Sequence, residues 1–218
     1  ATNCYPRDAA AILLIEIDGL PAEVAATGDR IAELCRQNGA RTITVATDPE
    51  ERLRLWKGRK AAFAAMGKLS PDYYVQDGVI PRTQLPYVLA EIERLGDQHG
   101  YRVANVFHAG DGNLHPLILY NNAIPGQLEQ VEELGGDILK LCVRVGGSIS
   151  GEHGIGADKR CYMPDMFSPT DLETMGWVRQ AFDPERLANP TKLLPTPRTC
   201  GEAARSVAAA TLPEVERF

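Results

Sequence analysis

The chain has 218 residues and a mass of 23.8 kDa, enough for one sizeable core and at most two domains. It carries 23 Lys and Arg against 29 Asp and Glu, which argues against a nucleic-acid binder, because binding a phosphate backbone needs clustered positive charge. The longest apolar run, residues 9–15, is far shorter than the roughly 20 residues of a membrane-spanning helix. We therefore expect no transmembrane segment and no export signal.

Segments with strand character alternate with helical segments along the first two thirds of the chain. The predicted strands are residues 11–17, 41–46, 72–76, 102–109 and 114–120. The predicted helices are residues 23–37, 49–66, 85–99, 126–145 and 169–182. Because the last two strands flank a glycine-rich turn, they predict an antiparallel hairpin. We therefore expect an α+β sandwich, with an antiparallel sheet covered by helices, rather than a doubly wound parallel sheet.

Three of the four histidines, His108, His115 and His153, lie in short glycine-rich segments. If Asp111 and Gly112 are the central residues of the hairpin turn, His108 faces His115, and the Cβ atoms of opposed residues lie about 5 Å apart. Two imidazoles so placed can bind one divalent ion. They can equally form a cross-strand pair without metal, and the spacing alone does not decide between the two.

Glu152 is the best candidate for a third ligand, because the glycines of residues 151–156 (GEHGIG) let the backbone approach a ligand closely. Two histidines and one carboxylate leave coordination positions open, as in a catalytic site. His153 would then stand beside the ion as a free imidazole that can take up a proton. The loop lacks the Gly-Lys-Ser/Thr ending of a P-loop and the spacing of a dinucleotide fingerprint.

The predicted helix 49–66 carries five basic residues, which most simply form a solvated face. Arg59 stands out because Trp56 and Phe63 lie three residues before it and four after it, on the same side of a helix. A guanidinium at the edge of such an apolar patch can bind a carboxylate with two parallel hydrogen bonds.

Two motifs and the chain ending resemble one flavoprotein family. They are residues 106–116 (VFHAGDGNLHP), 147–156 (GSISGEHGIG) and 213–218 (PEVERF). Together they resemble the C-terminal, or cap, half of the FAD-linked glycolate-oxidase-type flavoproteins, a family that includes D-lactate and D-2-hydroxyglutarate dehydrogenases. The resemblance implies a ferredoxin-like α+β sandwich with a C-terminal helical tail. It makes residues 1–183 the substrate- and metal-binding cap domain, and residues 184–218 a tail that returns to a flavin domain outside this chain.

The resemblance also implies roles for individual residues. His108, His115 and Glu152 match the ligands of a divalent metal (Zn, Mn, Fe or Co). His153 matches the catalytic base and Arg59 the arginine that binds the substrate carboxylate. The candidate contacts to the FAD, which is bound mainly by the missing domain, are Asn113, Asn189 and Lys192.

The implied reaction is the oxidation of a small 2-hydroxy acid, glycolate or D-lactate, by hydride transfer from its Cα to FAD. The chain begins at Ala1 rather than Met, so we expect it to be part of a longer protein and to be inactive alone. Other oxidase subunits are expected partners, and the cytoplasm, or the inner face of the membrane, is the expected location.

Two positions depart from the family pattern. Leu117 stands where relatives that use dicarboxylates often carry Asn, which favours a small monocarboxylate. Thr191 replaces Gly in the segment 189–192. Two other functions stay open at this point. One is a stand-alone metallohydrolase that uses the same three ligands with a bound water as nucleophile, and the other is a non-catalytic subunit of an oxidoreductase complex.

Overall fold

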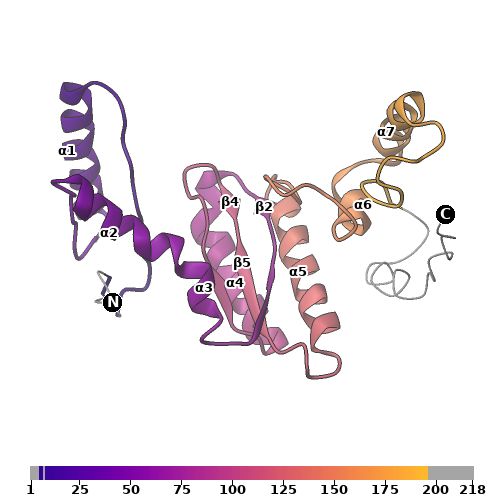
Figure 1. The fold of residues 1–218 in the computed structure, drawn as a ribbon, viewed down its shortest axis with the longest axis horizontal. Coiled ribbons are helices and arrows are strands. Elements are labelled where there is room, and N and C mark those ends of the chain that lie inside the picture. Colours follow the sequence, from indigo (N-terminus) through magenta and orange to yellow (C-terminus); the bar gives the residue numbers. More distant parts are fainter. Residues whose placement is uncertain (1–4, 7, 196–218) are drawn as a thin grey trace, which may run out of the picture. The chain divides into compact units, whose positions relative to one another are not determined.

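The computed structural model describes residues 5, 6 and 8–195. The chain divides into two compact units, and the boundary in the sequence falls between Ala65 and Met66. The first unit carries the helices α1 (Pro21–Gln37) and α2 (Pro49–Lys60), and α3 (Ala62–Met66) ends at the boundary (Figure 1). Asp48 caps α2, since its Oδ1 accepts the Glu51 N–H at 2.8 Å.

Two predicted strands of the first unit do not form. Residues 11–17 and 41–46 have no regular secondary structure. A strand needs a neighbour to satisfy its backbone N–H and C=O groups, and within the described ranges neither segment has such a partner. Their apolar side chains are consequently exposed, Leu13 to 62% and Val45 to 70%. The prediction of strands at these positions was wrong for the structure as described.

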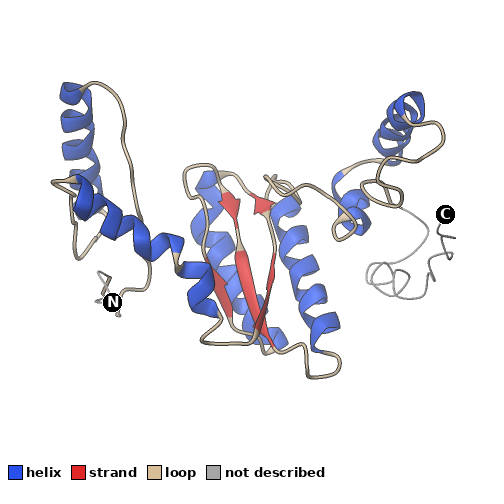
Figure 2. Ribbon diagram, in the orientation of Figure 1, coloured by secondary structure: helices blue, strands red, loops and turns tan. Residues whose placement is uncertain are grey.

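The second unit contains an antiparallel sheet, drawn in red in Figure 2. Its strand order is β1 (Asp72–Val75), β5 (Pro116–Tyr120), β3 (Val103–Asn105). Two shorter strands, β2 (Gly78–Val79) and β4 (Asn113–Leu114), pair with each other. All the pairs assigned in residues 5, 6 and 8–195 are antiparallel, which confirms the predicted α+β class and excludes a doubly wound sheet.

Two long helices, α4 (Leu85–His99) and α5 (Gln127–Arg144), pack against each other and against the sheet. If β1 with β2 and β4 with β5 are each counted as one interrupted strand, the chain order is β–α–β–β–α. After α5, Ser148 forms an isolated antiparallel bridge with Val79, at the place in the order of a last strand. This is the order of a ferredoxin-like sandwich. The main core lies between helices and sheet, and its fully buried members include Val88, Ile92, Ile118, Val131, Leu134 and Ile138.

The segment after Ser148 adds short elements to this sandwich. They are a 3₁₀ turn (Arg160–Tyr162), α6 (Met163–Met166) and α7 (Pro169–Phe182). A second small core of Leu139, Ile149 and Met163 joins them to α5. Ser168 and Asp171 form a reciprocal capping box at the start of α7. None of the helices within the described ranges has the length and apolar character needed to cross a membrane.

Candidate active site

The hairpin that carries two of the site histidines has a different register from the predicted one. His108, rather than facing His115, bridges Asn113, and the turn between them has four residues (109–112) instead of two. The pairing has shifted by two positions. Because side chains alternate between faces with a period of two, this shift leaves both histidines on one face. Their ring centroids lie 5.6 Å apart, so the predicted proximity is confirmed although the predicted register is wrong.

Gly112 makes the longer turn possible. Its φ of +73° lies in the left-handed region, and a Cβ at this position would stand 2.1 Å from the Ile80 carbonyl oxygen. The backbone can therefore approach β2 closely, and the Ile80 N–H donates to the Gly112 carbonyl at 2.9 Å. This contact fixes the hairpin end, next to the two histidines, against the start of the neighbouring segment.

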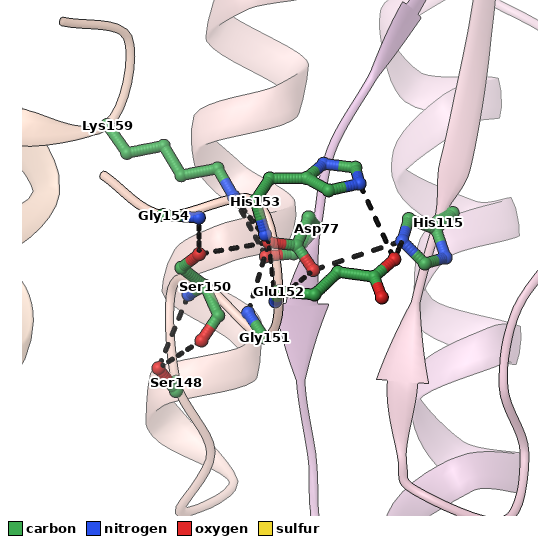
Figure 3. A network of polar contacts seen from close by, with 9 residues as sticks. All are labelled: Asp77, His115, Ser148, Ser150, Gly151, Glu152, His153, Gly154 and Lys159. Atoms are coloured by element: carbon green, nitrogen blue, oxygen red, sulfur yellow. Dashed lines mark hydrogen bonds and ion pairs between the residues drawn. The ribbon is translucent and has the colours of Figure 1, made fainter. Parts of the chain in front are cut away.

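The structure brings the three predicted metal ligands together. One ligand atom from each of His108, His115 and Glu152 lies within 4.8 Å of the other two. The shortest of these contacts joins His115 Nε2 to Glu152 Oε1 at 2.8 Å (Figure 3). His115 is buried, whereas His108 and Glu152 are exposed. The group is therefore closed at its buried end, at His115, and open on the side of His108 and Glu152, from which a small molecule can enter.

The surroundings of His115 fit a metal ion. The residue is 4% exposed, and neither ring nitrogen has an aligned hydrogen-bond partner among the described residues, although Glu152 lies close. Buried polar atoms of this kind normally have a partner. Burial lowers the pKa of His115, and the nearby Glu152 carboxylate only partly offsets that effect. A neutral imidazole with a free lone pair, beside a carboxylate, is what a divalent cation needs.

His153 follows Glu152 at the open side of the site. Its ring centroid lies 5.1 Å from that of His115, and its Nε2 lies 3.5 Å from Glu152 Oε1. About half of its side-chain surface is exposed. An imidazole so placed can reach a molecule bound at the three ligands and exchange a proton with it.

Asp77, which is not among the residues predicted from the sequence, is the most connected polar residue of the site. It is fully buried between β1 and β2, and Figure 3 shows it at the centre of the hydrogen-bond network. Its carboxylate accepts the backbone N–H groups of residues 151–153. Lys159, also buried, donates to both the carbonyl and the carboxylate of Asp77. No motif flagged this residue, because its partners lie more than 70 positions away.

The charge state of Asp77 follows from these contacts. Burial raises the pKa of the carboxyl group, but the hydrogen bond from the His153 N–H and the Lys159 ammonium outweigh burial, so the pKa lies well below its ordinary value. Burial also lowers the pKa of Lys159, which its pairing with Asp77 partly offsets. The pair thus carries both charges in the interior at neutral pH.

We expect Asp77 to make the stability of the second unit pH-dependent in the acidic range. Because the folded-state pKa is lowered, the stabilisation is present above the unfolded pKa of about 3.9 and is lost as the pH falls through and below it. Urea unfolding between pH 6 and pH 3 measures this for the wild type and for Asp77→Asn. The stability difference between the two should shrink as the pH falls, and a difference that stays constant over this range would contradict the assignment.

The other predicted site residues lie elsewhere or make different contacts. Arg59 lies on α2 in the first unit, and its contact with substrate stays a prediction. Asn113 is 7% exposed, its Oδ1 has no hydrogen-bond partner in the part of the chain described, and a Cβ on Gly151 would stand 2.8 Å from its Cγ. It therefore borders the loop 150–154. Leu117 is fully buried in β5.

The start of the predicted tail contacts the end of the glycine-rich loop. The Leu193 N–H donates to the Gly156 carbonyl at 2.9 Å, and the buried Arg160 donates to the Thr191 carbonyl. Thr191 has a φ of +63°, a left-handed conformation that favours the Gly expected from the resemblance. The exposed Asn189 and Lys192 lie in this segment, and their contact with a flavin stays a prediction. The ending 213–218 lies outside the described residues.

Comparisons with known proteins agree on one family. The model of FAD linked oxidases, C-terminal domain, matches residues 1–193. The glycolate oxidase subunit GlcD of Escherichia coli (strain K12) is 52% identical over 217 residues, which cover 98% of this chain and 44% of the relative. The subunit of the same name from Bacillus subtilis (strain 168) is 30% identical over 188 residues, 86% of this chain and 40% of the relative.

A more distant relative is the mitochondrial D-lactate dehydrogenase [cytochrome] of Arabidopsis thaliana, 26% identical over 190 residues. These residues cover 86% of this chain and 33% of that protein. The chain thus spans less than half the length of each of these relatives.

Proposed function

The chain belongs to the family of FAD-linked oxidase C-terminal domains, and from this premise we propose that it is the substrate- and metal-binding part of a flavin-dependent 2-hydroxy-acid oxidase or dehydrogenase. The observation that carries the proposal is the convergence of His108, His115 and Glu152 on one point, with His153 beside it. The site geometry supports the metal-binding part of the proposal, and the family match supports the flavin-dependent reaction.

In this proposal each residue has one task. His108, His115 and Glu152 hold a divalent ion, for which Zn, Mn, Fe and Co suit the donor set. When bound, the ion supplies a Lewis acid that acidifies the substrate hydroxyl, and the flavin supplies the electron acceptor. His153 takes up the hydroxyl proton at its imidazole. Arg59 orients the substrate carboxylate through two parallel hydrogen bonds.

The substrate class in the proposal is a small monocarboxylate such as glycolate or D-lactate. Leu117, fully buried in β5, offers no polar group to a second carboxylate. Asn113, Asn189 and Lys192 are proposed to face the flavin, which a further domain of the whole protein binds. Residues 1–183 would then be the cap domain, and the segment from residue 184 would lead back to the flavin domain. Other oxidase subunits are proposed as partners.

The test uses the natural protein isolated from its source. We expect an intact mass well above 23.8 kDa, with FAD bound, because a domain adds about 100 residues or more. Anaerobic addition of glycolate or D-lactate should bleach the oxidised flavin spectrum, and a 2-hydroxy dicarboxylate should bleach it far more slowly. A mass of 23.8 kDa without flavin, or a flavin that neither monocarboxylate reduces, would overturn the proposal.

A further inference from the structure

The two oxygens of the Asp77 carboxylate make different contacts. Oδ2 accepts Ser150 Oγ at 2.9 Å and the backbone N–H groups of Gly151 at 3.1 Å and His153 at 2.9 Å. Lys159 Nζ lies 3.3 Å from the same oxygen. The Glu152 N–H donates to both oxygens at 3.3 Å, and Oδ1 lies 3.9 Å from His115 Nε2. One buried carboxylate thus contacts both the loop 150–154 and the histidine that faces this loop.

The loop depends on this contact for its shape. Gly151 and Gly154 lie in the loop, and Gly156 lies just after it. Without other restraints, these glycines allow the backbone many conformations. The side chains of Glu152 and His153 are each half exposed, so side-chain packing restrains them little. Their position relative to His115 is set mainly by their backbone, and consecutive N–H groups of that backbone converge on Asp77, as in an anion nest.

Lys159 adds further hydrogen bonds that hold Asp77 in place. Its Nζ donates to the Asp77 carbonyl at 2.9 Å and to the carboxylate, and both residues are buried. Ser150 adds a further tie, because its Oγ donates to Asp77 and accepts the Gly154 N–H at 2.8 Å. A buried carboxylate with this many donors is fully satisfied, which makes the arrangement rigid.

We propose that Asp77 is a positioning residue that fixes the loop 150–154 so that Glu152 faces His115 as a metal ligand and His153 stands ready as the base. The proposal rests on the function proposed above. Asp77 also belongs to a second group of possible ligands, with His115 and His153. Because its Oδ2 accepts five donors and its Oδ1 shares one of them, the Glu152 N–H, we assign Asp77 to the support of the ligands rather than to the metal itself.

The experiment measures the binding of Zn²⁺ alone to the full chain, by competition with a chelator. Asp77→Asn keeps the size of the side chain but replaces an accepting oxygen with an amide that donates. We expect the Kd for Zn²⁺ to rise by about 10–100-fold, as is typical when a group that orients metal ligands is lost. Asp171→Asn is the matched control: this carboxylate accepts the Ser168 N–H at the start of α7, away from the ligands, and its loss should leave the Kd unchanged.

A double-mutant cycle distinguishes positioning from a general loss of structure. If Asp77 acts through Glu152, Asp77→Asn should change the Kd by less than about threefold in a Glu152→Gln background, where the ligand it positions is already impaired. The same fold loss in both backgrounds, or a wild-type Kd in the single variant, would overturn the proposal. If Asp77→Asn does not fold, Ser150→Ala is tested in the same way, with a smaller expected loss of Zn²⁺ affinity.

Amide hydrogen exchange in the metal-free chain separates this inference from the proposed function. In Asp77→Asn, the amides of Gly151 and His153 should exchange about tenfold faster, because each loses a hydrogen bond to a charged group, while the amides of α4 keep their rates. Unchanged exchange at the two loop amides would overturn the anchor even if Zn²⁺ binds. A wild-type chain that binds no Zn²⁺ but shows the faster loop exchange in the variant would contradict the metal site and leave the anchor supported.

Discussion

Replacing His115 with alanine is expected to lower the affinity of the chain for Zn²⁺ by at least about 100-fold, or about 2.7 kcal/mol. His115 is the buried member of the predicted ligand set, and its ring nitrogens have no aligned hydrogen bond among the described residues. Its imidazole therefore has a free lone pair next to the Glu152 carboxylate. Removing it leaves two exposed ligands, His108 and Glu152, which bind a divalent ion weakly by themselves.

Isothermal titration with Zn²⁺ measures this effect, and His99→Ala is the matched control. His99 is the remaining histidine, and its Nε2 lies 3.3 Å from Asp137 on the α4–α5 face. Its loss should leave Zn²⁺ affinity unchanged. Because His115→Ala opens a cavity, His108→Ala serves as a second variant: this exposed side chain can be removed at little cost in stability. Wild-type affinity in both His108→Ala and His115→Ala would rule out the metal site.

The histidine pair shows how far a local pattern predicts a site. The glycine-rich turn placed His108 and His115 on adjoining strands, and alternation placed them on one face, so their proximity followed from the sequence. The register did not follow, because it depends on the close approach of Gly112 to Ile80, a residue that follows β2 and lies 32 positions earlier in the chain. The predicted proximity of the two rings was still correct, because a register error of two positions leaves both side chains on the same face of the hairpin. A register error of one position would have placed them on opposite faces.

The role of Asp77 does not follow from its local sequence. Nothing around it in the sequence differs from an ordinary strand end, and its role arises only when the chain returns more than 70 residues later to place three N–H groups around it. Residues 11–17 and 41–46 show the opposite failure. Their strand patterns are clear, but a pattern records only which residues favour a strand, and the hydrogen-bond partner must come from elsewhere. Local propensity therefore predicted the helices α1, α4 and α7 well and these two segments poorly.

The loss of the proposed base should have the largest effect on activity. In the flavin-containing natural protein, His153→Asn is expected to lower kcat for glycolate or D-lactate by about 10²–10⁴-fold, the usual contribution of general acid–base catalysis. KM should change little, because the imidazole acts on a proton that moves only in the transition state. Asparagine keeps the backbone N–H that donates to Asp77, so the loop should keep its shape. Anaerobic stopped-flow measurement of flavin reduction reports the step directly.

Zinc binding by the same variant determines whether His153 is a base or a ligand. His153 lies in one possible ligand group with Asp77 and His115, and beside another that contains His108, His115 and Glu152. If His153 is the base, His153→Asn loses flavin reduction and keeps the wild-type Kd for Zn²⁺. A variant that lacks a metal ligand should instead lose both flavin reduction and Zn²⁺ affinity. A parallel fall in Zn²⁺ affinity would make His153 a ligand instead. Wild-type flavin reduction would remove it from the reaction altogether.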